Sequence, residues 1–245
     1  MSNFLTEMRE TLAPSRTSTF GPLPPLLIAM TIVTGLVDAF SYLVLGHVFV
    51  ANMTGNVVFL GFAVAGAQGF SIPASLVALV AFGVGSILGG RIVARFGQHR
   101  GHHLAVSSGL EAVFLAISVV LASWSSSAPQ HALRYAIIIV LSLATGIQNA
   151  SIRKLAVPDL TTTVLTMTVT GIGADSALGG GAGSKSGRRV LAIGAMFVGA
   201  LLGALLVLHV RIVVPLAIAL VMIMFVAWAS YGAGKSDPPW TVAQS

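Results

Sequence analysis

Long apolar stretches follow one another along most of the chain, with few charged positions inside them. Each covers about 18 to 23 residues, and a helix of about 20 apolar residues crosses a hydrocarbon core about 30 Å thick. The pattern therefore predicts an all-α bundle with six membrane-spanning helices. The predicted spans are Leu23–Leu45, Ser71–Gly90, Leu104–Trp124, Tyr135–Ile152, Val190–Leu208 and Ile212–Tyr231.

Two further apolar segments, Val48–Ala67 and Leu160–Ala174, are unusually rich in asparagine and threonine. The second lies between two aspartates, and as a helix it would reach only about 22 Å, which is short of a span. Backbone that is not helical at membrane depth must be buried in protein or line a cavity, where hydroxyls and amides replace its missing hydrogen bonds. The two segments are predicted to be re-entrant or broken helices. Ordinary spans with threonine-rich packing faces are the alternative.

The chain also contains an internal repeat, because three sequence matches occur in the same order at nearly constant separations of 111, 112 and 114 residues. Such repeats are how many small transporters build a site at the membrane midplane. The matches are Thr34–Ala39 with Thr145–Ala150, Thr54–Val57 with Thr166–Val169, and Ala81–Gly90 with Ala195–Ala204.

The distribution of lysine and arginine indicates how often the chain crosses the membrane. Eight crossings would leave seven basic residues inside and six outside, which is no bias. Six crossings leave only Arg134 and Arg211 outside and the other eleven inside. We therefore predict six spans with both ends cytoplasmic. Three spans per repeat invert the second half relative to the first.

This topology divides the chain into two membrane repeats, with tails and a connecting loop. The first repeat is residues 22–124, the loop is 125–134 and the second repeat is 135–232. Residues 1–21 and 233–245 are predicted to be cytoplasmic tails. Apolar residues recur at helical spacing near the N-terminus, which would suit a short helix on the membrane surface, but a disordered tail is favoured.

Composition excludes several classes of protein. With 56% hydrophobic and only 8% charged residues, the chain is not water-soluble. Its basic residues are too sparse to follow a nucleic-acid backbone, so the bilayer is the expected partner, with anionic lipid at Arg91, Arg95 and Arg100. There are no cysteines, and no catalytic order or metal-ligand spacing occurs within one plausible site. No enzyme activity, cofactor or metal is therefore expected, and the sequence leaves the oligomeric state undetermined.

Four short motifs resemble a known group of small bacterial integral membrane proteins, the YoaK family. The motifs are Gly35–Ala39, Val48–Val58, Gly146–Ala150 and Thr161–Thr166, and the similarity covers most of residues 24–231. The resemblance implies a multi-pass protein of the bacterial cytoplasmic membrane. It supplies no catalytic or substrate-binding residues.

Polar groups inside predicted spans indicate a candidate site, because they are costly in a bilayer. Asp38 lies well inside the first span, and its counterpart in the second repeat is Asn149, next to Gln148. A carboxylate in a low-dielectric bundle favours its neutral form and could carry a proton. The alternative is that Asp38 only holds helices together by hydrogen bonds. The complete candidate set for substrate binding or translocation is Asp38, Asn52, Thr54, Asn56, Gln148, Asn149, Thr163 and Thr166.

The predicted function is a transporter or channel for a small polar solute or ion. A membrane scaffold or accessory subunit without transport activity is the alternative, in which the same polar residues only organise the helices.

Overall fold

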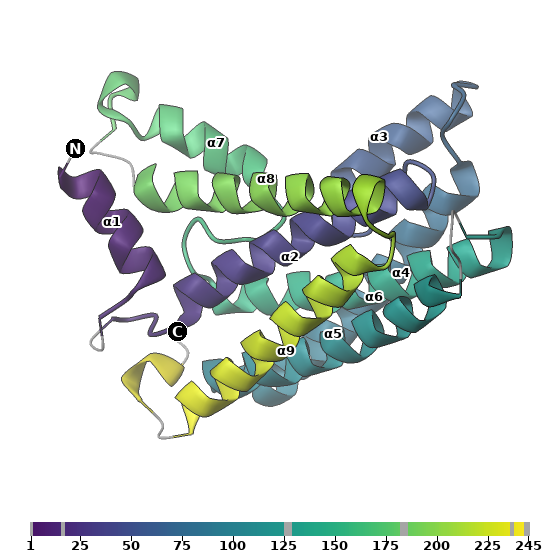
Figure 1. Cartoon of the computed structure of the whole chain (residues 1–245). Coiled ribbons are helices and arrows are strands. Elements are labelled where there is room, and N and C mark those ends of the chain that lie inside the picture. The colour runs from purple at the N-terminus through teal and green to yellow at the C-terminus, as the bar shows by residue number, and fades with distance from the viewer. Residues whose placement is uncertain (1, 16–17, 125–128, 182–185, 236–237, 243–245) are drawn as a thin grey trace.

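The computed structural model describes residues 2–15, 18–124, 129–181, 186–235 and 238–242, which are helical for most of their length (Figure 1). Arg16, Lys185 and residues 125–128 of the predicted connecting loop lie outside this part of the chain. The elements in chain order are α1 (Ser2–Leu12), α2 (Leu23–Val44), α3 (Met53–Val64), α4 (Ile72–Phe96), α5 (Arg100–Ser123), α6 (His131–Leu155), α7 (Leu165–Ala174), η1 (Ala177–Gly179), α8 (Ser186–His209), α9 (Val214–Gly234) and η2 (Pro239–Thr241).

Six of these helices, α2, α4, α5, α6, α8 and α9, are long and apolar enough to cross a membrane. This confirms the all-α polytopic bundle. Some helices extend beyond the predicted spans, so that α4 reaches Phe96 and α6 reaches Leu155. Capping explains two starts, because Ser71 accepts a hydrogen bond from the Ala74 amide and His99 accepts one from the His102 amide.

The two asparagine- and threonine-rich segments contain only short helices. α3 has 12 residues and α7 has 10, which correspond to about 18 Å and 15 Å of helix. Neither helix is long enough to cross a hydrocarbon core by itself, which agrees with the prediction of broken or re-entrant segments and not with two ordinary helical spans. In Figure 1, α3 and α7 lie at opposite ends of the bundle.

The packing of the long helices follows the repeat. α2 packs along α8 and α9, and its counterpart α6 packs along α4 and α5. The third spans of the two repeats, α5 and α9, pack against each other. If each helix is exchanged for its counterpart in the other repeat, the same set of helix pairs results. The first span of each repeat packs against the second and third spans of the other repeat, so the two repeats interlock.

Glycines allow the closest of these approaches, and they occupy equivalent positions in the two repeats. A Cβ on Gly199 of α8 would collide with the backbone of Ile32 in α2. A Cβ on Gly85 of α4 would collide in the same way with Leu143 in α6. The separations between the matching residues are those of the sequence repeat. Within a bilayer no hydrophobic effect drives helices together. Small residues at such crossings let two backbones approach closely, so that van der Waals contacts hold the helices together.

Contacts along the helices show that the second repeat is inverted. Along α2, Ile32 faces Gly199 and Leu36 faces Gly203, so α2 and α8 run in the same direction. Arg100, at the junction of α4 and α5, donates a hydrogen bond to the Thr19 carbonyl just before α2. α4 therefore ends where α2 begins, and the two run in opposite directions. Since α6 is parallel to α4 in the same way, α6 is antiparallel to its counterpart α2.

The described parts of both predicted tails are structured, and for the N-terminal tail this corrects the expectation of disorder. Near the N-terminus, α1 is fastened to the start of α8, where Glu7 accepts a hydrogen bond from the Gly187 amide. Leu5 and Leu12 remain exposed on it, as the surface-helix alternative requires. At the C-terminal end, Trp240 is buried against Gly21. Tertiary contacts far apart in the sequence order both segments.

The predicted lipid contacts fall in two groups. Arg91 and Arg95 are exposed on the last turns of α4. Arg100 is only 5% exposed, because its guanidinium reaches the Thr19 carbonyl and lies 5.5 Å from the centre of the Phe20 ring. It is therefore a structural contact between α5 and the segment before α2, and it is not available to lipid headgroups.

Candidate functional site

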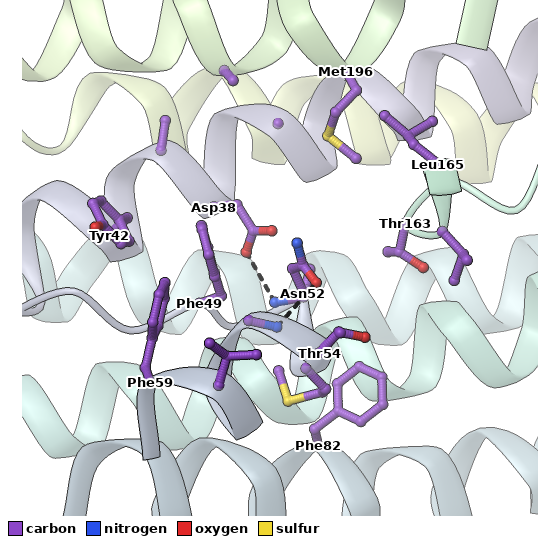
Figure 2. Close-up of a pocket in the computed structure, with 18 of the residues that line it drawn as sticks. Asp38, Tyr42, Phe49, Asn52, Thr54, Phe59, Phe82, Thr163, Leu165 and Met196 are labelled. Carbon is purple, nitrogen blue, oxygen red and sulfur yellow. Dashed lines mark hydrogen bonds between the residues drawn. The ribbon is translucent and has the colours of Figure 1, made fainter. Parts of the chain in front are cut away.

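A cavity of about 770 Å³ lies between the two repeats (Figure 2). Its wall is formed by α2, the loop before α3, and residues of α3, α4, α6, α7 and α8. Six of the eight predicted site residues line it, and they come from segments that are far apart in the sequence. These six are Asp38, Asn52, Thr54, Asn149, Thr163 and Thr166.

Asp38 joins the cavity to the loop that precedes α3. Its Oδ1 accepts hydrogen bonds from the amides of Val50 at 3.2 Å and Ala51 at 2.9 Å. The other carboxylate oxygen points towards the cavity in Figure 2. Asp38 thus has a structural oxygen and an oxygen that a solute can meet.

Asn56 and Gln148 do not line the cavity, and their contacts explain why. The side chain of Asn56 accepts a hydrogen bond from the Phe49 amide at 2.9 Å and donates one to the Phe49 carbonyl at 2.6 Å. Gln148 donates to the hydroxyls of Thr34 at 3.2 Å and Thr162 at 3.3 Å. Asn56 holds the backbone of Phe49 and Gln148 holds two threonine hydroxyls, so the structure places both side chains behind the cavity wall and not at the solute.

In the second repeat, the uncharged Asn149 takes the place of Asp38 and again accepts a hydrogen bond from the segment before a short helix. Asn149 accepts a hydrogen bond at 2.6 Å from the hydroxyl of Thr163, which precedes α7. Thr162, next to it, has a positive φ of 60°, which is rare for a β-branched residue. The hydrogen bond from Gln148 fixes Thr162 in this conformation.

Comparison of the two repeats shows where the cavity is symmetric. Phe82 in α4 and Met196 in α8 are separated by 114 residues, and each lies one turn before the close-packed glycine of its helix. Thr54 and Thr166 are separated by 112 residues and line the cavity from the first turns of α3 and α7. The cavity therefore lies where equivalent positions of the two inverted repeats meet.

Sequence reasoning missed most of the aromatic lining. Phe49 and Phe59 line the cavity beside Tyr42, and their ring centres are 5.6 Å apart. An apolar ring in an apolar segment carries no signal of its own.

An ion-pair network holds α7 beside α8. Arg189, near the start of α8, contacts Asp159 at 2.8 Å and Asp175 at 2.7 Å. The two aspartates flank the segment that contains α7, so one guanidinium ties both of its ends to α8. This network positions Thr163 and Thr166 at the cavity.

One buried acid lies outside the cavity lining. Glu111 of α5 is 2% exposed, and no hydrogen bond from the described residues reaches its Oε2.

Comparison with known proteins shows similarity over most of the chain. Residues 26–229 match the family described as "Protein of unknown function (DUF1275)". The chain is also 36% identical over 146 residues to "UPF0700 transmembrane protein YoaK" of Bacillus subtilis (strain 168). That alignment covers 59% of this chain and 63% of the relative, so it spans less than two thirds of the relative's length. No solved structure matches.

The family match includes all six long helices and both short ones, from within α2 to within α9. It contains every residue that lines the cavity. The six apolar helices and the transmembrane relative agree on a multi-pass membrane protein. The chain belongs to the DUF1275 family, as the resemblance of its motifs to YoaK predicted.

Proposed function

We propose that the chain is a transporter or channel for a small polar solute or ion, and not an enzyme. The observation that supports this most is the cavity between two inverted repeats, lined by a carboxylate from one repeat and an amide from the other. Inverted-repeat transporters place their sites where discontinuous helices meet near the midplane. The proposed substrate contacts are Asp38, Asn52, Thr54, Asn149, Thr163 and Thr166, with Asn56 and Gln148 as positioning residues.

The short helices suit this role because they carry polar groups to the cavity without crossing the membrane. α3 and α7 each begin at the cavity, and their connections to the long helices are set by hydrogen bonds of Asp38, Asn56 and Gln148. A small change at either junction would move one short helix relative to the other repeat. The proton-carrying role of Asp38 stays a prediction.

The proposed location is the bacterial cytoplasmic membrane, with both ends of the chain in the cytoplasm. The bias of basic residues towards one side supports this orientation. Arg91 and Arg95 are exposed where anionic headgroups of the inner leaflet would lie, so we retain them as lipid contacts.

A ligand screen tests the proposed function. The purified protein is heated with small cations, anions, zwitterions and neutral polyols, and any solute that raises Tm is then tested for flux in proteoliposomes. A solute at 100 times its Kd stabilises the folded state by about 2.7 kcal/mol. At least one solute is expected to raise Tm and to cross proteoliposome membranes.

Two tryptophan variants of α8 serve as a matched pair in this screen. Ala204 lines the cavity, so Ala204→Trp is expected to block binding and flux. Leu208 on the same helix is 65% exposed, so Leu208→Trp is expected to retain both. If no solute class stabilises the wild type or crosses the membrane, the scaffold alternative is favoured. If Ala204→Trp leaves flux unchanged, transport does not pass through this cavity.

A further inference from the structure

The charge of the cavity is one-sided. Asp38 is the one carboxylate among the described residues that line it, and the lining has no lysine, arginine or histidine. Interactions between charges strengthen as water is excluded, because the effective dielectric constant falls. The ionised form of Asp38 repels an anion, which finds no basic partner in this lining, and attracts a cation, which in turn favours the ionised form.

Aromatic rings lie beside this carboxylate. The ring centres of Tyr42 and Phe49 are 5.1 Å apart and those of Tyr42 and Phe59 are 5.9 Å apart. Figure 2 shows the three rings together on the Asp38 side of the cavity, away from Thr163 and Leu165. Ring faces attract cations, and aromatic walls with an acid are a general solution for binding quaternary ammonium groups.

The aromatic and acidic lining is confined to the first repeat. The position equivalent to Asp38 is Asn149, and that of Phe59, 112 residues later, is Gly171. The second repeat therefore builds the same helices without the acid and without this ring. Since the repeated fold needs an acceptor at the position of Asp38 but neither a negative charge nor the Phe59 ring, another explanation for the charge and the ring is needed.

The helix ends are the main opposing effect. α3 and α7 both begin at the cavity, and helix N-termini favour anions with about half an elementary charge each. At α3 this effect is offset by Asp38, whose Oδ1 accepts from the Val50 and Ala51 amides just before the helix. α7 begins at Leu165, on the far side of the cavity from the rings in Figure 2. A positive group at the rings therefore meets the carboxylate and avoids the α7 end.

The size of the cavity selects the kind of cation. A volume of about 770 Å³ lies in the range of about 300–1,000 Å³ that is typical of sites for organic ligands. Hard metal ions need six or more oxygen ligands gathered around one point. The oxygen-bearing side chains of the lining are instead divided between the two repeats, with Asp38, Asn52 and Thr54 in the first and Asn149, Thr163 and Thr166 in the second.

We propose that the cavity binds an organic cation, an amine or quaternary ammonium with an apolar substituent, whose charge lies between Asp38 and the rings of Tyr42, Phe49 and Phe59. This inference rests on the proposed function, because it names the substrate class of the same site.

The test compares three soluble probes that each carry one benzene ring. They are benzyltrimethylammonium, neutral N-benzylacetamide and anionic benzenesulfonate. Binding to the purified full-length protein is measured by calorimetry and by the shift in Tm. The cation is expected to bind at least about tenfold more tightly than the neutral probe, which corresponds to about 1.4 kcal/mol, and the anion is expected to bind least.

Variants connect this binding to the named residues. Asp38→Asn keeps an acceptor for the Val50 and Ala51 amides and removes the charge, so it is expected to lower affinity for the cation at least about tenfold. Phe59→Leu should lower it by roughly 2- to 30-fold, the range of cation–π contributions. Phe62→Leu is the matched control, because Phe62 lies on the same helix, contacts Phe59 and does not line the cavity. Unliganded Tm values verify that each variant is folded.

The possible failures are distinguishable. Equal affinity for the cation and the neutral probe, tighter binding of the anion, or no cation binding up to about 10 mM would each overturn the proposed substrate class. An Asp38→Asn variant that is folded and binds the cation as wild type does would also overturn it. If the cation binds as expected but does not cross proteoliposome membranes, the binding site stands and the transport function fails.

Discussion

Replacing Gly199 with alanine is expected to lower the free energy of unfolding of the detergent-solubilised protein by about 1–3 kcal/mol, the usual cost of overpacking. The new methyl group would collide with the backbone of Ile32, so α8 and α2 would have to separate. Backbone cannot rotate away as a side chain can. Gly85→Ala is expected to have a similar effect through Leu143, because the repeat makes the two crossings equivalent.

Two glycines on the same helices provide controls. Gly194 in α8 and Gly90 in α4 have no atom within 4 Å of an added Cβ. Alanine there should leave stability unchanged or raise it by about 0.4–1 kcal/mol, because the unfolded chain loses conformational freedom. Thermal or chemical unfolding of all four variants measures the difference. Four equal shifts would contradict the interlocked packing of the repeats.

Asp38 is expected to respond very differently to two substitutions. Asp38→Ala removes the acceptor of the Val50 and Ala51 amides, and an unsatisfied buried donor costs about 1–3 kcal/mol. This variant should lose several kcal/mol of stability. Asp38→Asn retains an oxygen at the same place, so it should unfold close to the wild type. Denaturation of both variants measures the structural part of the role of Asp38.

The functional part is measured on the folded asparagine variant. If the oxygen that faces the cavity meets the solute, Asp38→Asn should lose solute binding while keeping its stability. A variant that is strongly destabilised, yet binds solute normally, would instead assign Asp38 to helix packing alone.

The fold was largely predictable because bilayer thickness sets the length of a span. Leu23–Leu45 and Ile212–Tyr231 were recognisable from hydrophobic length alone, and the shortness of Leu160–Ala174 indicated a segment that does not cross. Charge asymmetry and the repeat then predicted the inversion that the direction of α2 and α8 shows. The structured ends were not predictable, since α1 and Trp240 are ordered by contacts with Gly187 and Gly21.

The sequence predicted those site residues that are polar inside otherwise apolar spans. Asp38 and Asn149 are conspicuous inside apolar spans, and both line the cavity. Asn56 and Gln148 are equally conspicuous, but their roles depend on which groups the folded chain places beside them, the Phe49 backbone for Asn56 and the Thr162 hydroxyl for Gln148. The Phe49 and Phe59 rings were missed because only the path of the loop before α3 places them beside Asp38.

Cysteine accessibility at two exposed loop positions tests most directly whether the repeats are inverted around the cavity. The chain has no cysteine of its own, so single replacements at Gln68, between α3 and α4, and at the exposed Leu178, between α7 and α8, are unambiguous. These are equivalent places in the two repeats, so inverted repeats put them on opposite sides of the membrane. With an impermeant thiol reagent on intact cells, Gln68→Cys should label and Leu178→Cys should label only after permeabilisation. If both variants label in intact cells, or if both label only after permeabilisation, the two positions lie on the same side and the inverted repeat is contradicted.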